Sequence, residues 1–176
     1  ILSDKKINKK GQRIFYTYTA IPQSTGADSI PYITIMQVNK VLTKEPVFVE
    51  DNDAKDYGTD PIEISGQSIS KAHLNLRYTF LNGGNHLIPH SISLLIAKDA
   101  QPDARGYLSA ELRHDAADDL QLNANSGYVS FTLENMPGFK EGTLKGFKIK
   151  TKTIKNETDI VEVTMNNNRK SMNFNI

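Results

Sequence analysis

The sequence predicts an all-β fold, specifically a two-sheet antiparallel sandwich of jelly-roll type with one short helix. Short segments rich in β-branched and aromatic residues alternate apolar with polar positions, which is typical of half-buried strands. Turn-forming residues separate these segments at short intervals, and strands do not alternate with helices as they do in doubly wound folds. With 176 residues, we expect a flexible basic arm over residues 1–13 and a single sandwich domain over residues 14–176.

The clearest strand covers residues 72–81, where apolar Leu74, Leu76 and Tyr78 alternate with polar residues. A period of two places one face of a strand in a core. Residues 90–97 alternate in the same way after a glycine-rich turn, so we expect the two segments to form a hairpin. The other expected strands cover residues 14–21, 32–42, 47–49, 62–64, 128–133, 144–154, 159–165 and 171–176.

The short helix is expected within residues 104–122. Leu108, Leu112, Ala116 and Leu120 are spaced by four, which places them on one stripe of a helix. Residues 107–112 also fit a strand, and the sequence alone leaves the two interpretations open.

The composition excludes several classes of protein. The chain has no cysteine, which excludes disulfides, thiolate metal sites and a cysteine nucleophile. No apolar run approaches the roughly 20 residues that a membrane helix needs, so we expect no membrane span. Because the chain starts at Ile1 and not at a methionine, we expect a fragment, a processed product or part of a longer chain.

The charges are separated along the chain although the net charge is only +1. Residues 1–13 carry five cations against one acid, and residues 140–155 carry six lysines against one acid. Residues 45–63 carry seven acids against one lysine. Blocks of opposite sign can steer partners or join subunits, and they are also typical of solvated loops and tails.

A basic strand is the main candidate binding feature. Lys148, Lys150 and Lys152 alternate with Phe147 and Ile149, so a strand would align the three ammonium groups on one face about 7 Å apart. Such a ridge suits a phosphate backbone or an acidic protein surface, whereas on an edge strand it would only prevent aggregation. The expected binding residues for nucleic acid or an acidic partner are Lys145, Lys148, Lys150, Lys152, Lys155, Lys5, Lys6, Lys9, Lys10 and Arg13.

Metal sites are weakly supported, and we expect no metal and no cofactor. Asp51 and Asp53 match the first two ligand positions of an EF-hand loop, but Lys55 occupies the third, so the motif fails. His86 and His90 are four residues apart in an expected loop, which does not align them as a helix would, and His73 is a third ligand to consider.

Catalytic motifs are also absent from the sequence. It contains no G-x-S-x-G nucleophile elbow and no phosphate-binding glycine loop. A serine triad or a carboxylate pair assembled in space stays open, because neither is visible in sequence. Tyr16 and Tyr18 share a strand face and fit either a stacking platform or a packed core.

We therefore expect a non-enzymatic assembly or partner-binding module, with a viral or phage structural protein as one natural setting. Its charged faces would contact neighbouring subunits or nucleic acid. The expected partner is a protein or a second copy of the chain, with nucleic acid and glycan as alternatives. Two further hypotheses are an extracellular module that binds carbohydrate or a cell-surface partner, and a hydrolase with a spatially assembled site.

Overall fold

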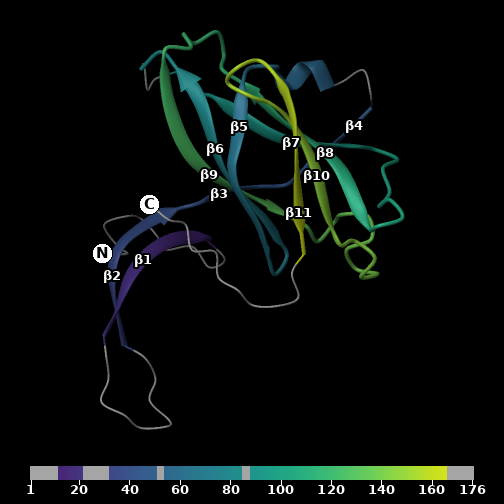
Figure 1. Ribbon diagram of the computed structural model, residues 1–176, viewed down its shortest axis with the longest axis horizontal. Coiled ribbons are helices and arrows are strands. Elements are labelled where there is room, and N and C mark those ends of the chain that lie inside the picture. The colour runs from purple at the N-terminus through teal and green to yellow at the C-terminus, as the bar shows by residue number, and fades with distance from the viewer. Residues whose placement is uncertain (1–11, 22–31, 51–53, 85–87, 166–176) are drawn as a thin grey trace. The chain divides into compact units, whose positions relative to one another are not determined.

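The computed structural model describes residues 12–21, 32–50, 54–84 and 88–165 (Figure 1). The chain divides into two compact units, residues 1–42 and residues 43–176. The first unit contains an antiparallel hairpin of β1 (Ile14–Ile21) and β2 (Tyr32–Lys40), with a bulge at Thr17/Tyr18. Residues 1–11 of the expected basic arm and the expected strand 171–176 lie outside the described residues.

The larger unit is a β-sandwich, and the predicted all-β sandwich fold is confirmed. One sheet has five strands in the order β11-β10-β8-β7-β4, and the other has four in the order β3-β9-β6-β5 (Figure 1). Their bounds are β3 Leu42–Lys44, β4 Val47–Val49, β5 Ile62–Ser70, β6 His73–Asn82, β7 Ser91–Ala97, β8 Tyr107–Asp115, β9 Asn123–Thr132, β10 Gly146–Lys152 and β11 Thr158–Thr164.

The core lies between the two sheets, because apolar residues alternate inward along the strands. Leu74 and Leu76 on β6 and Phe131 on β9 come from the four-stranded sheet, and all are almost completely buried. Phe147 and Ile149 on β10 meet them from the five-stranded sheet. Burial of this apolar surface is the main favourable contribution to folding.

The helix expected within residues 104–122 does not form. Tyr107–Asp115 is strand β8, with Leu108 and Leu112 pointing into the core. A spacing of four is also twice the strand period, so the same residues satisfy both patterns. Ala116 is buried beyond the strand, whereas Leu120 is 64% exposed.

The described residues contain a single helical turn, the 3₁₀ helix η1 (Ala54–Tyr57) within the acidic segment. In the part of the chain described, no helix has the length and apolarity required to cross a membrane.

Two expected pairings differ in the structure. β6 and β7 do not form a hairpin, since β6 pairs with β5 and β9 while β7 pairs with β8 and β4. The link between them crosses from one sheet to the other, which local sequence patterns do not reveal. Two pairs are parallel, β8 with β10 and β4 with β7, because the chain leaves the five-stranded sheet and returns to it between their members.

Truncation of the core should destabilise the sandwich. Phe131 is fully buried, so Phe131→Ala should lower the free energy of unfolding by about 3–5 kcal/mol. Leu120→Ala removes an exposed side chain and should change it by less than about 0.5 kcal/mol. Urea denaturation of both variants measures the difference, and equal losses would contradict this description of the core.

Candidate functional site on the outer face of the five-stranded sheet

The lysines of β10 lie on the outer face of an interior strand. β10 is hydrogen-bonded to β8 on one side and to β11 on the other. Phe147 and Ile149 are buried in the core, so the alternating side chains of Lys148, Lys150 and Lys152 point away from it. Edge protection therefore does not explain these lysines, because β10 is not an edge strand.

Each of the three lysines has a polar partner. Lys148 Nζ donates to Asp103 Oδ2 at 2.7 Å. Lys150 Nζ lies 3.5 Å from Glu111 Oε1. Lys152 Nζ donates to the Thr59 carbonyl at 3.0 Å.

Asp103 is organised as an anion. Its carboxylate accepts from Lys148 and from the backbone N–H groups of Tyr107 and Arg105. The hydrogen bond from Lys148, followed by that from Tyr107, lowers the pKa of Asp103 to about 2. This carboxylate therefore neutralises Lys148 throughout the physiological pH range.

Glu111 is shared between two cations. Its Oε1 atom lies 3.0 Å from Arg113 Nε and 3.5 Å from Lys150 Nζ. Arg113 also donates from Nη1 to the Gly58 carbonyl at 3.1 Å. Its Nε is buried and makes no hydrogen bond within the described residues, so the contact with Glu111 is an ion pair without hydrogen-bond alignment. One carboxylate thus pairs with two cations, and neither cation makes a well-aligned hydrogen bond to it.

Two adjacent hollows open on this face and share Glu111, Arg113 and Lys150. The larger encloses about 480 Å³ and the smaller about 260 Å³. The larger combines these charges with an apolar wall and the smaller with hydroxyl and amide groups. The apolar wall consists of Val49, Ala54, Leu95, Ala97 and Ile160.

The acidic segment reaches the same face. The Asp60 carboxylate accepts from the Ala116 N–H at 2.8 Å, and the Asp60 N–H donates to the His114 carbonyl at 3.0 Å. Gly58 has φ +73°, and a Cβ there would lie 2.4 Å from the His114 carbonyl oxygen. The end of this segment is therefore fixed to β8.

Substitution of Gly58 tests this attachment. Gly58→Ala combines a left-handed backbone with a clash against backbone atoms, so it should cost about 2–3 kcal/mol of stability. Gly142 has φ +71° with nothing within 4 Å of a Cβ, so Gly142→Ala should cost only about 1–2 kcal/mol. Thermal unfolding compares the two, and an equal loss would show that Gly58 does not need its close approach.

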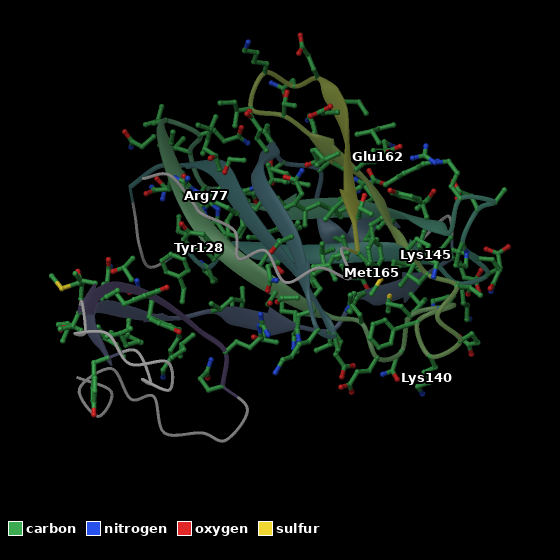
Figure 2. All side chains as sticks on the ribbon, turned by 60° about the horizontal axis from the view of Figure 1, so that its bottom comes forward. Arg77, Tyr128, Lys140, Lys145, Glu162 and Met165 are labelled. Atoms are coloured by element: carbon green, nitrogen blue, oxygen red, sulfur yellow. The ribbon has the colours of Figure 1, made fainter. Side chains whose placement is uncertain are left out.

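The other predicted binding residues lie apart from the hollows or outside the described residues. Lys145 is exposed just before β10, with Met165 N–H donating to its carbonyl at 2.7 Å (Figure 2). Lys155 is exposed in the turn between β10 and β11. Arg13 belongs to the hairpin unit and is half-buried. Lys5, Lys6, Lys9 and Lys10 lie outside the described residues, and their binding role stays a prediction.

Sequence reasoning missed Glu111, Arg113 and Ile160 as members of this face. Glu111 and Arg113 are two residues apart on β8, so the strand interpretation of this segment would have placed them on one face. No local signal connects Ile160 to them, because that contact depends on the pairing of β11 with β10.

The outer face of the four-stranded sheet has a different character. Hydroxyl and amide side chains of Ser68, Asn75 and Ser130 form a hydrogen-bonded set across β5, β6 and β9. Arg77 and Tyr128 are cross-strand neighbours on this sheet (Figure 2). In the hairpin unit, Tyr16 and Tyr18 are 43% and 57% exposed, so they are not core residues.

His90 and His114 belong to a chain of hydrogen bonds that ends on Asp119. His86, the other histidine of the predicted pair, lies outside the described residues. His90 Nδ1 lies 2.9 Å from His114 Nε2, and His90 Nε2 lies 3.1 Å from Asp119 Oδ2. His114 Nδ1 lies 3.0 Å from the Pro61 carbonyl oxygen. The ring of Phe80 meets both imidazoles edge-on. Within the described residues, no group of three or more His, Asp or Glu side chains is placed to hold a metal ion.

The proton on His114 can be placed from the groups that its two ring nitrogens contact. The Pro61 carbonyl can only accept, so the Nδ1 atom of His114 carries a proton. Burial lowers the pKa of His114, so its Nε2 is an acceptor and His90 Nδ1 donates to it. The other ring nitrogen of His90, Nε2, lies beside the Asp119 carboxylate. The hydrogen bond from the Gly83 N–H lowers the pKa of Asp119, and the contact with His90 lowers it by a smaller amount.

The buried His114 and the Asp119 carboxylate should make the stability of the protein depend on pH. The pKa of His114 lies below 6.5 in the folded protein. Just below pH 6.5, His114 therefore binds a proton in the unfolded protein but not in the folded protein. Stability should therefore be lost as the pH falls below about 6.5, and further below about 4, where the lowered pKa of Asp119 contributes with the same sign.

Urea denaturation at pH 7.5 and 5.5 tests the contribution of His114. Wild type should lose about 1 kcal/mol more between these values than His114→Gln does. The control Leu122→Ala removes a side chain that is 70% exposed and does not titrate, so it should follow wild type. An identical pH profile for His114→Gln and wild type would contradict the buried neutral state of His114.

These features define a class of protein: an open-faced β-sandwich whose outer sheet face combines apolar, basic and acidic side chains around shallow hollows. Residues 45–165 match the family model of the NigD-like C-terminal beta sandwich domain. The chain therefore belongs to the family of NigD-like proteins with this domain. No curated protein matches the sequence.

Solved structures of bacterial proteins share the fold. A protein of unknown function from Bacteroides vulgatus has a TM-score of 0.72 and 19% identity, over 94% of this chain and 76% of that chain. A protein from Parabacteroides distasonis described as toxin-related has a TM-score of 0.64 and 26% identity, over 88% and 73%. A NigD-like immunity protein from Bacteroides caccae has a TM-score of 0.61 and 17% identity, over 86% and 70%.

The expectation of a viral or phage structural protein is wrong. The family match and the similar structures are with bacterial NigD-like immunity and toxin-related proteins. The error came from fold-level analogy, because a charged β-sandwich occurs in many unrelated proteins.

Proposed function

We propose that this chain is a non-enzymatic, immunity-type protein that acts by binding a protein partner. The observation that carries the proposal is membership of the NigD-like family, since a protein of similar fold is described as an immunity protein. The open outer face of the five-stranded sheet supports it, because apolar residues mixed with charged groups are typical of protein interfaces.

The site chemistry favours binding over catalysis. Glu111, the carboxylate shared by the hollows, is ion-paired with Arg113 and Lys150, and hydroxyl side chains such as Ser109 and Thr158 also line the hollows. Nucleophilic catalysis needs a hydroxyl within hydrogen-bond reach of a base. His114 is buried, and the side chain of its hydrogen-bonded neighbour His90 is 11% exposed.

A protection assay tests the proposed function. A Bacteroides strain carries the chain on a plasmid and is grown beside a panel of strains that secrete antibacterial proteins. We expect survival to rise at least tenfold against one attacker relative to an empty plasmid, and Phe131→Asp, which should unfold the core, to abolish the gain. Unchanged survival against every attacker, with the chain shown to be folded and expressed, would contradict an immunity role.

A further inference from the structure

We propose that the outer face of the five-stranded sheet docks an extended, acidic segment of a protein partner that carries apolar side chains next to its carboxylates. The inference rests on the proposed function and assigns the docking face and the chemistry of the partner.

A single row of side chains crosses all five strands. Strand register aligns Val47 with Leu95, Leu95 with Glu111, Glu111 with Lys150, and Lys150 with Ile160. Neighbouring strands are about 4.8 Å apart, so the row is about 19 Å long, the length of about six extended residues. The row begins and ends on apolar side chains and has charge at its centre.

The charges on this face favour an acidic partner. The charged residues lining the two hollows are four cations, Arg113, Lys148, Lys150 and Lys152, and two carboxylates, Asp60 and Glu111. Asp103 pairs with Lys148 from outside the hollows, which leaves three cations against two carboxylates. The side chain of Lys150 is 53% exposed, and its ion pair with Glu111 is a long contact of 3.5 Å. An incoming carboxylate can therefore bind Lys150 without first breaking a close pair, whereas a basic segment meets like charge.

The apolar residues favour a polypeptide over a nucleic acid. Ile160 is 61% exposed beside Lys150 in the register of the sheet. A phosphate backbone would use the cations and leave this side chain in water. Side chains two residues apart lie on the same face of an extended segment, so a segment with an apolar and an acidic side chain at successive alternate positions engages both kinds of residue at once.

Two labelled nine-residue peptides with serine at every second position provide the probe. The positions between the serines alternate leucine with glutamate in one peptide and leucine with lysine in the other, so that both kinds of side chain lie on one face of the extended peptide. Fluorescence anisotropy at 50 mM NaCl should show the acidic peptide binding at least 20-fold more tightly than the basic one. Raising NaCl to 300 mM should weaken binding of the acidic peptide at least fivefold, because exposed charges are screened.

Variants of the face identify where the peptide binds. Lys150→Glu with Lys152→Glu should weaken the acidic peptide at least tenfold, and Ile160→Ser at least threefold. The matched control Lys140→Glu reverses an exposed lysine in the turn before β10, outside both hollows (Figure 2), and should stay within twofold. Circular dichroism checks folding, and Lys150→Gln with Lys152→Gln replaces the charge reversal if that variant unfolds.

Several outcomes would overturn the docking proposal. They are equal binding of both peptides, unchanged binding in the lysine variant, no binding at 1 mM peptide, tighter binding of a 20-base-pair DNA, or a salt-sensitive dimer in which a second copy covers the face. Protection by the lysine variant in the survival assay would leave the immunity role intact and refute this docking face. Peptide binding without protection would support the face and refute the immunity role.

Discussion

The position of β10 inside its sheet is the constraint on which the candidate site depends. With β8 and β11 hydrogen-bonded on its two sides, the strand can direct its side chains only inward or outward. Phe147 and Ile149 point inward and pack in the core. The outward lysines therefore lie on a surface that the neighbouring strands complete with apolar and acidic residues, and the same backbone that stabilises the sandwich gives the outer face its rigidity.

Long-range contacts then determine what this rigid face contains. Asp103 is 45 residues from Lys148 in sequence, and Glu111 reaches Lys150 only through the parallel pairing of β8 with β10. The carboxylates neutralise part of the basic charge without removing it. Such exposed pairs contribute little to stability. The main consequence of this arrangement is the pattern of charge that it gives to a binding surface.

Local periodicity predicted the strands well because alternation is a property of each segment by itself. The expected strands at residues 14–21 and 47–49 have the observed bounds, and the strand expected at residues 72–81 covers residues 73–82. Pairing was not predictable: the expected hairpin of β6 and β7 spans two sheets, and the spacing of Leu108 and Leu112 suits a helix and a strand equally. The lysines of β10 were identifiable from their spacing, whereas Glu111, Arg113, Ile160 and the His90–His114 pair become neighbours only through tertiary structure.

The central claim, that the outer face of the five-stranded sheet is a binding surface, is tested most directly by amide chemical-shift mapping. The isotope-labelled chain is titrated with the acidic peptide, and the perturbed residues are assigned to the two sheets. Our account predicts that the largest changes occur at Glu111, Lys150 and Ile160. Changes concentrated instead at Arg77 and Tyr128, on the four-stranded sheet, would contradict it.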